Sequence, residues 1–347
     1  MSVIPVLKNK TQSKTQSEPV SLEPLVAILA NDMRAVNEMI LQRLSSDVPL
    51  IHKLAGHLIA AGGKRIRPMM TLAGAKIAGG DERAISLATA VEFIHSATLL
   101  HDDVIDESSL RRGHDTANAL WGNDASVLVG DFLFARAFEL MVEVDNIKVL
   151  GRLASASAKI TEGEIKQMAI AGRPDIPQDA YFDVITGKTA ILFAAAAASG
   201  AQLAGANDSD IKVMHEYGLQ LGLAFQIMDD AMDYAVNADT MGKNSGDDFH
   251  DQKITLPIIL AWEDGTIEDR AFWKRTIGDG NFADGDLANA QAILTHHDTI
   301  NRSIEVASEY AKAANSALQR LSSIDGDHAN LVNALMAAAR FSAARKS

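Results

Sequence analysis

Apolar residues recur along most of this chain at intervals of three and four positions, the spacing that gathers them on one face of an α-helix. Ser21 precedes the first such segment, which we expect to run to about Ser46 with Leu25 and Leu29 on its apolar face. Stretches dense in β-branched residues, which favour strands, do not occur in the sequence. The pattern therefore predicts an all-α fold.

Glycine, proline and capping residues divide this pattern into successive helices. Pro68 suits the first position of a helix, and Asp81 is expected to cap the next one. Further helices are expected at about 50–61, 123–144, 146–171 and 208–235, with shorter ones over 263–347. Because no repeat and no long linker divides the chain, we expect one helical domain over residues 21–347, after a disordered tail at 1–20.

The composition narrows the classes of partner. The 347 residues are 47% hydrophobic but only 5% aromatic, so alanine and aliphatic side chains must form the core. A formal net charge of −13 argues against nucleic acid, because binding the phosphate backbone requires a basic surface. The absence of cysteine excludes disulfides, zinc–thiolate sites and thiol nucleophiles. No signal-peptide pattern begins the chain, and polar residues interrupt its most apolar run, Thr189–Ala206, so we expect a buried helix and a cytoplasmic protein.

The stretch from Leu99 to Gly113 carries three aspartates, Asp102, Asp103 and Asp106, at the end of an apolar helical segment. Residues three and four apart are neighbours on a helix, so these carboxylates crowd together near the negative end of the helix dipole. A cation would relieve the repulsion, and oxygen ligands without cysteine suit Mg²⁺ together with substrate phosphates. A solvated acidic helix end is the alternative for this cluster considered alone.

A second apolar helical segment repeats the arrangement with Asp229, Asp230 and Asp233. Two such clusters on two helices can face each other across a bundle and hold several metal ions between them. The pair Arg111–Arg112 follows the first cluster directly, and arginine suits bidentate recognition of phosphate. The repetition favours a metal-bridged diphosphate site over two solvated helix ends.

Basic residues elsewhere are placed to bind an anion. The turn at 62–68 puts Lys64 and Arg67 beside a helix start, where backbone N–H groups also face an anion, although an ordinary surface turn has the same pattern. Lys188 lies in an apolar helix, where an unpaired charge is costly. Gly187-Lys188-Thr189 looks like the end of a P-loop, but no strand and no earlier glycine precede it, so we reject that interpretation.

Two further elements fit the same site. The polar loop at 237–253 follows the second cluster and carries Lys243 and Lys253, which can cover bound phosphates as a lid. His95 lies two helical turns before Asp102 on roughly the same face. A lone helical histidine is more often a core residue than a ligand, so both interpretations of His95 stay open.

Five segments carry a resemblance to a known family by their order and spacing: GGKRIRP, LLHDDVIDESSLRRG, GKTA, FQIMDDAMDY and GKNSGDDFHDQKITLP. Over about residues 22–345 the chain resembles the trans-isoprenyl (polyprenyl) diphosphate synthases, in particular the long-chain octaprenyl or decaprenyl type. It departs from the family pattern in the lid loop, which contains HDQK where relatives often have EGK. The segment ESSLRRG also differs, because many relatives have an aspartate in its middle.

The resemblance implies an isoprenoid-synthase-type helical bundle around a central cavity, and a prenyltransferase that condenses isopentenyl diphosphate onto an allylic diphosphate. It implies three Mg²⁺ ions with substrate bound, held by Asp102, Asp103, Asp106, Asp229, Asp230 and Asp233. The allylic diphosphate would contact Arg111, Lys188, Lys243 and Lys253, and isopentenyl diphosphate would contact Lys64, Arg67, His95 and Arg112. Thr189 and Gln226 would shield the allylic cation, so the implied catalytic set is Asp102, Asp103, Lys188, Thr189, Gln226 and Asp229.

Product length is expected to depend on an apolar tunnel beneath the first cluster. Ala97 and Thr98 lie one turn before it and are small, where short-chain relatives often carry an aromatic floor. Phe132, Phe134 or Phe138 would form a deeper floor, unless they are plain core residues. A helical turn of about 5.4 Å matches roughly one isoprene unit, so we expect about eight to ten units, for a quinone side chain such as that of ubiquinone. A medium-chain geranylgeranyl product is the alternative.

Two other functions share part of this pattern. A terpene cyclase has the first aspartate motif, but its second motif is normally of an Asn/Ser/Glu type and it lacks GGKxxRP. A non-catalytic subunit of a heteromeric synthase typically loses one cluster or the basic residues, and this chain keeps them all. By resemblance we expect a homodimer, with at most peripheral membrane contact because no anchoring helix is evident.

Overall fold

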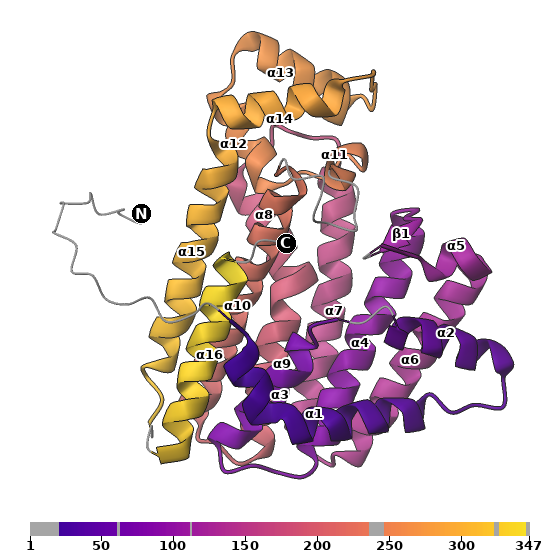
Figure 1. Cartoon of the computed structure of the whole chain (residues 1–347), viewed down its shortest axis with the longest axis vertical. Helices are drawn as coiled ribbons and strands as arrows, with labels where there is room; N and C mark the ends of the chain where they lie inside the picture. Colours follow the sequence, from indigo (N-terminus) through magenta and orange to yellow (C-terminus); the bar gives the residue numbers. More distant parts are fainter. Residues whose placement is uncertain (1–20, 61–62, 112, 236–245, 323–325, 345–347) are drawn as a thin grey trace, which may run out of the picture.

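The computed structural model describes residues 21–60, 63–111, 113–235, 246–322 and 326–344. Within these ranges the chain forms α-helices, π-helical turns and a small antiparallel hairpin, which confirms the all-α prediction (Figure 1). The first half contains α1 (Glu23–Arg43), α2 (Pro49–Ala60), α3 (Ile66–Ile77), α4 (Ala84–Ile105), β1 (Leu110–Arg111), β2 (His114–Asp115), α5 (Ala117–Trp121), α6 (Asn123–Glu143) and α7 (Ile147–Ile170). The second half contains α8 (Gln178–Ile185), the π turn η1 (Thr186–Ala190), α9 (Ile191–Leu203), α10 (Asp208–Asp233), α11 (Asp247–His250), α12 (Leu256–Asp264), α13 (Ile267–Trp273), the π turn η2 (Lys274–Gly278), α14 (Asp286–His296), α15 (Thr299–Leu318) and α16 (Gly326–Ala344).

Two helix starts differ from the sequence prediction. α3 begins at Ile66 instead of Pro68, because Arg65 adopts a left-handed conformation (φ 47°) and turns the chain into the helix earlier. The Asp81 carboxylate accepts hydrogen bonds from the backbone and guanidinium of Arg83, so it organises the turn before α4 instead of capping that helix. The predicted tail at 1–20 lies outside the described residues, and the single domain stays a prediction.

Small residues allow the central helices to approach closely. A Cβ on Gly200 of α9 would lie 1.9 Å from the Thr71 carbonyl oxygen of α3, and one on Gly74 would lie 2.2 Å from that of Ala197. These two helices therefore cross in backbone contact, which leaves little room for aromatic rings. Nearly every residue of α9 is buried, which confirms that the alanine-rich run is a core helix.

Two helical segments are long and apolar enough to cross a membrane by length and composition alone, Ala84–Ile105 and Gln178–Leu203. In the bundle, 61% and 78% of their most apolar windows are buried against other helices. Core helices pass the same test, so this observation is weak support for a membrane span.

The two helices that carry the aspartate clusters end on the same side of the molecule. α4 runs up to the hairpin β1–β2, and α10 runs up to α11, so the hairpin and α11 flank the ends of both helices (Figure 1). The backbone N–H of Gly246, just before α11, donates to the carbonyl oxygen of Asp233 at 3.0 Å. The fold thus places both clusters, the hairpin and α11 around one opening.

Candidate active site

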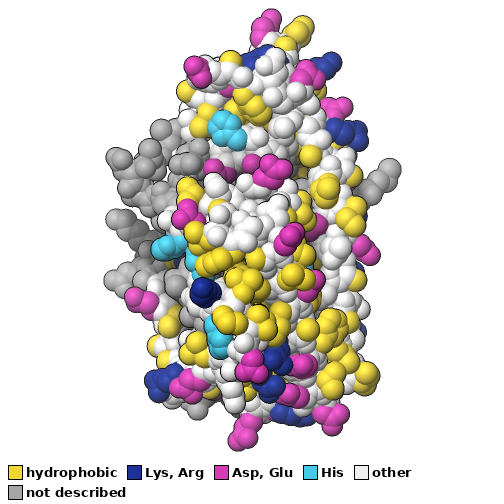
Figure 2. Space-filling view, turned by 90° about the vertical axis from the view of Figure 1, so that its right-hand side faces the viewer, with side chains coloured by type: hydrophobic (Ala, Val, Ile, Leu, Met, Phe, Trp, Pro, Cys, Tyr) yellow, Lys and Arg dark blue, Asp and Glu magenta, His cyan; other side chains and the backbone are white. Residues whose placement is uncertain are grey.

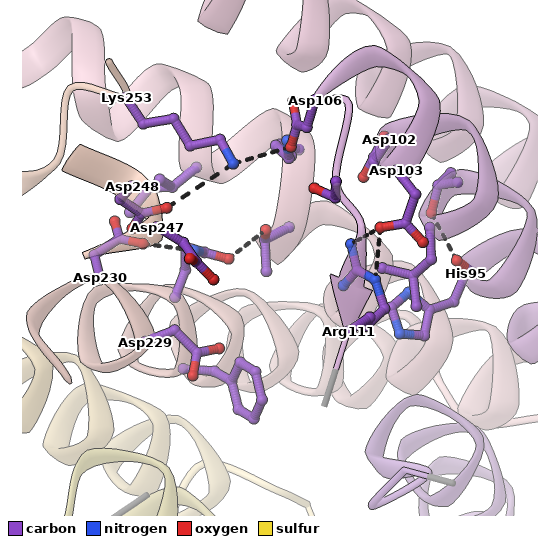
Figure 3. A pocket seen from close by; sticks show the side chains of 18 of the residues that line it. His95, Asp102, Asp103, Asp106, Arg111, Asp229, Asp230, Asp247, Asp248 and Lys253 are labelled. Atoms are coloured by element: carbon purple, nitrogen blue, oxygen red, sulfur yellow. Dashed lines mark hydrogen bonds and ion pairs between the residues drawn. The ribbon is translucent and has the colours of Figure 1, made fainter. Parts of the chain in front are cut away.

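A cavity of about 940 Å³ opens where α4 and α10 end, and both aspartate clusters line it (Figure 3). Its lining also includes most of the other residues that the sequence predicted for the site: Lys64, Arg67, His95, Thr98, Arg111, Lys188, Thr189, Gln226 and Lys253. Arg112 and Lys243 lie outside the described residues. The fold therefore brings together segments that are far apart in the chain.

The first cluster is partly neutralised by two cations. The hairpin carries Arg111, whose Nε and Nη2 lie 2.8 Å and 2.6 Å from one carboxylate oxygen of the buried Asp103. Lys253, from the loop after α11, lies 2.9 Å from Asp106 (Figure 3). Arg111 was predicted to contact an allylic diphosphate, and in this structure its guanidinium is bound to the cluster itself.

Asp102, the remaining carboxylate of this cluster, is half-buried in the cavity wall. Burial raises the pKa of Asp102 to about 7, and the carboxylates of Glu164 and Asp106 add to this rise, while Lys188 and Arg111 oppose it. A carboxylate held in this way gains from a nearby cation, because the cation removes the cost of its negative charge.

The second cluster has a different pattern of contacts. Asp230 is buried, and its two oxygens accept hydrogen bonds from the Tyr181 hydroxyl (2.6 Å) and from Gln226 Nε2 (2.7 Å). Burial raises the pKa of Asp230, and the nearby Asp248 adds to the rise. Asp233 accepts a hydrogen bond from the backbone N–H of Asp248 at 3.1 Å. Burial and Asp230 also hold the pKa of Tyr181 above its usual range, so this phenol keeps its proton at neutral pH.

Lys188 and Thr189 lie in the π turn η1 between α8 and α9. Gly163 of α7 permits this turn to pack closely, since a Cβ there would lie 2.4 Å from the Lys188 backbone nitrogen. Lys188 Nζ pairs with Glu164 at 2.8 Å, and Thr189 Oγ1 donates to Gln226 Oε1 at 2.8 Å. Lys188, whose unpaired charge would be costly in an apolar helix, therefore has a carboxylate partner. It lies in a π turn, and such turns are frequent at functional sites.

Cationic residues around the start of α3 line another part of the cavity. Arg67 Nη1 lies 3.0 Å from His95 Nε2, and the Arg67 guanidinium lies 4.3 Å from the centre of the Phe193 ring. Lys64 Nζ lies 4.9 Å from the centre of the Phe341 ring. The contact between Arg67 and His95 places both in one polar group, which favours the interpretation of His95 as a site residue over a satisfied core residue.

The described segment after α11 reaches across to the first cluster through Lys253. Lys253 Nζ lies within 2.9 Å of Asp106 and Asp251, and 3.9 Å from Asp248. Burial lowers the pKa of Lys253, but these three carboxylates outweigh burial and hold the pKa above its usual range. Lys253 is therefore a charged link between the loop and the end of α4.

The donor set fits a hard divalent metal ion. Six aspartates of the two clusters line one cavity in a chain without cysteine, and burial already disfavours the charge of Asp102 and Asp230. Among the described residues, no group of three acidic or histidine side chains lies close enough to hold a metal ion by itself. This arrangement suits Mg²⁺, which usually takes one or two carboxylates and completes its shell with water and substrate phosphates.

Several polar residues of the site were missed in the sequence, among them Glu92, Gln167 and Tyr181, which line the cavity, and Glu164, which pairs with the lining residue Lys188. Glu92 pairs with Arg65 and is buried three residues before His95, so a glutamate inside an apolar helix was its signal. Glu164 and Gln167 share one face of α7, and each has a buried oxygen with no hydrogen-bond partner among the residues that the structure describes. Tyr181 had no signal, because its partner Asp230 is remote in the chain.

The residues expected to set product length lie at different depths. Thr98 lines the cavity, whereas Ala97 is fully buried and Phe132 is half-buried under the Arg136 guanidinium. Phe134 stacks on His101, and Phe138 is 46% exposed on the outer face of α6. Their roles in product length stay predictions.

Comparison with known proteins agrees with this geometry. Residues 48–294, more than half of the chain, match the family model for polyprenyl synthetase. The octaprenyl diphosphate synthase of Escherichia coli (strain K12) is 45% identical over 76% of this chain and 81% of its own length. A solved polyprenyl synthase from Caulobacter crescentus CB15, complexed with calcium and isoprenyl diphosphate, is 45% identical with a TM-score of 0.89, covering 94% of this chain and 98% of that one. A decaprenyl diphosphate synthase structure from Rhodobacter capsulatus is 46% identical with a TM-score of 0.88, covering 93% and 98%. The chain belongs to the polyprenyl synthetase family.

Proposed function

We propose that this protein is a long-chain trans-polyprenyl diphosphate synthase, which adds isopentenyl diphosphate repeatedly to an allylic diphosphate. The observation that carries the proposal is the single cavity in which two aspartate clusters, from α4 and α10, face separate groups of cations. The octaprenyl and decaprenyl diphosphate synthases to which the chain is similar support the long product over a geranylgeranyl one.

The residues divide into groups with distinct tasks. The allylic diphosphate binds to three cations that line the cavity around the two clusters, Arg111, Lys188 and Lys253. Lys243, which lies outside the described residues, is a further proposed contact. The six aspartates would hold Mg²⁺, three ions with substrate bound, some of them through water, and this metal would supply the positive charge that stabilises the departing diphosphate. Fixed cations of this kind stabilise the charge that develops as the carbon–oxygen bond breaks.

The second substrate binds at the other cationic group. Lys64, Arg67 and His95, with Arg112, hold the diphosphate of isopentenyl diphosphate without a metal. Thr189 and Gln226 present oxygen atoms toward the cavity and shield the allylic cation that the isopentenyl double bond attacks. No side-chain nucleophile takes part, and the departing diphosphate accepts the proton that is lost.

The test of this proposal is product analysis with purified protein, Mg²⁺, farnesyl diphosphate and labelled isopentenyl diphosphate, with products resolved by chain length. We expect products of about forty to fifty carbons, which serve as precursors of quinone side chains such as that of ubiquinone. A stop at about twenty carbons would keep the enzyme but replace the long product by the geranylgeranyl one. Absence of turnover with both substrates and metal would favour the non-catalytic subunit.

Ala97 and Thr98 are the residues at which we place the upper limit of the tunnel, with Phe132 as a deeper floor. The variant Ala97→Tyr puts an aromatic ring at a fully buried position one turn below the first cluster. We expect the main product to shorten to about twenty carbons, because the ring fills the space that further isoprene units require. An unchanged product distribution would contradict this assignment, and Ala288→Tyr at an exposed position of α14 is the control.

An exposed apolar stripe on α6 supports the homodimer. Leu128, Phe138 and Val142 are 66%, 46% and 65% exposed, and Figure 2 shows apolar side chains gathered on the side of the molecule that carries this helix. A second copy of the chain is the occupant that we propose for this face. Phe138→Glu combined with Val142→Glu should convert a dimer to a monomer in size-exclusion chromatography with light scattering.

We also place the enzyme in the cytoplasm, with at most peripheral membrane contact through its lipid product.

A further inference from the structure

A chain of hydrogen bonds connects the buried Tyr181 with Gln226 and Thr189, the residues proposed to shield the allylic cation. The Tyr181 hydroxyl donates to Asp230 Oδ2 (2.6 Å), and Gln226 Nε2 donates to Asp230 Oδ1 (2.7 Å). Gln226 Oε1 then accepts a hydrogen bond from Thr189 Oγ1 (2.8 Å). Four side chains from α8, η1 and α10 thus form one continuous network along the wall of the cavity.

Each bond in this network fixes the direction of the next one. An ionised Asp230 only accepts hydrogen bonds, so the amide nitrogen of Gln226 must point toward it. The amide oxygen of Gln226 then points toward Thr189, whose hydroxyl must use its single proton as the donor. The remaining lone pairs of Thr189 and Gln226 stay available for the cavity, which is the polarity that a carbocation requires.

The anchor of this network is the contact between Tyr181 and Asp230. Tyr181 is buried, and its ring packs edge-on against Phe182, so the hydroxyl is held in one place. Without that donor, one oxygen of a buried carboxylate would lack a partner, and Asp230 would turn to find another. Gln226 would lose its fixed orientation at the same time, because Asp230 is its partner in α10.

We propose that Tyr181 is a positioning residue for the prenyl transfer step: through Asp230 it orients the amide of Gln226, so that the oxygens of Gln226 and Thr189 face the allylic cation. The inference rests on the proposed function of this site. In this arrangement Asp230 anchors the network with both of its oxygens, while Asp102, Asp103 and Asp229 remain the main carboxylates for metal.

The test begins with Tyr181→Phe, which keeps the ring and removes only the hydroxyl. We expect kcat to fall by about tenfold, the effect of one lost hydrogen bond in the transition state, while the KM values for both diphosphates change less than about twofold. Tyr217→Phe is the matched control: Tyr217 is also buried, and its hydroxyl donates to the Leu335 carbonyl oxygen at 2.9 Å, away from the cavity lining. The control should lower the melting temperature by a similar amount and leave kcat unchanged.

A double-mutant cycle tests whether the effect passes through the network. Thr189→Val keeps the shape of the side chain and removes the hydroxyl at the far end of the chain of hydrogen bonds. If Tyr181 acts by orienting that end, Tyr181→Phe should cost less than about threefold in kcat once Thr189 is Val. An equal tenfold loss in both backgrounds would overturn the proposal, because Tyr181 and Thr189 would then act independently.

The dependence of rate on Mg²⁺ concentration separates this role from a metal-binding one. The proposal requires that Tyr181→Phe leaves the half-saturating Mg²⁺ concentration unchanged and lowers kcat at saturating metal. A raised half-saturating concentration with an unchanged kcat would overturn it, and would show that Tyr181 serves a metal-binding Asp230 instead. These measurements need turnover by the unmodified protein, so a failure of the proposed function appears in the unmodified protein, before any variant is compared.

Discussion

The second aspartate of each cluster is buried, but the two carboxylates are stabilised in different ways. Asp103, at the end of α4, is bound by the charged guanidinium of Arg111. Asp230, in the last turn of α10, is bound by two neutral donors, Tyr181 and Gln226, and its pKa is raised by burial. The same sequence spacing thus produces an ion pair in one helix and a neutral hydrogen-bond network in the other.

This difference between Asp103 and Asp230 shows that two clusters with the same sequence pattern can have different roles in one reaction. A carboxylate paired with a cation keeps its charge at little cost, whereas one held by neutral donors keeps its charge at a cost that a further cation can remove. The first cluster is therefore prepared to bind a metal–diphosphate complex with a cation already present. In the second cluster, the two hydrogen bonds of Asp230 also orient the side chains beside it.

The largest effect should come from removing a carboxylate that binds metal. Asp102→Asn and Asp229→Asn are each expected to lower kcat by about a thousandfold, because the charge that stabilises the departing diphosphate is lost. Steady-state kinetics with farnesyl and isopentenyl diphosphates measures this. Asp175→Asn, an exposed aspartate in the loop before α8, is the control and should retain full activity. Activity within tenfold of the unmodified protein in either cluster variant would contradict the assignment.

The next effect concerns the ion pair of the first cluster. Arg111→Ala leaves Asp103 buried without its cation, so we expect the free energy of unfolding to fall by about 3 kcal/mol in metal-free protein. Denaturant unfolding followed by circular dichroism gives this value. Arg136→Ala, which breaks an exposed pair with Glu139, should cost less than about 1 kcal/mol. Equal losses of unfolding free energy in the two variants would show that the Arg111–Asp103 pair stabilises the fold no more than an exposed pair does.

Metal and diphosphate should then stabilise the protein. A ligand that binds only the folded state at about one hundred times its dissociation constant adds about 2.7 kcal/mol of stability. We therefore expect Mg²⁺ with inorganic diphosphate to raise the melting temperature by several degrees, and EDTA to reverse the rise. Either component alone should have a much smaller effect, since the carboxylates within the described ranges form no complete metal site by themselves. A full shift with Mg²⁺ alone would contradict that view.

The smallest effect is a pH dependence that comes from a buried carboxylate in each cluster, Asp102 and Asp230. Burial raises the pKa of Asp230 from 3.8 to about 7, so the folded protein binds this proton more tightly than the unfolded chain does. The resulting stabilisation is complete below the unfolded pKa and is lost as pH rises through the folded pKa. In metal-free protein, unfolding should therefore require less denaturant at about pH 8 than at about pH 5, by the order of 1 kcal/mol. Asp230→Asn should reduce this slope, and so should Asp102→Asn, because burial raises the pKa of Asp102 to about 7 as well.

The comparison also shows what could be predicted from the sequence. Both clusters, the basic segment with Lys64 and Arg67, and Lys188 could be found because each is a local pattern of charges or an oddity within a helix. The partners of the buried carboxylates could not, because they come from other elements. Arg111 was assigned to substrate, and the structure pairs it with Asp103. Tyr181 carries no local signal at all, since an apolar helix with one tyrosine is an ordinary core helix.

The π turn between α8 and α9 determines how the site would respond to the deletion of one residue. Such a turn is an α-helix with one extra residue, and every side chain beyond that residue is rotated by about 100° around the helix axis. Lys188 and Thr189 lie in this turn and line the cavity. Deletion of Gly187 would remove the extra residue and rotate the two flanking helical segments relative to each other by about 100°. We therefore expect it to separate Lys188 and Thr189 from their partners Glu164 and Gln226.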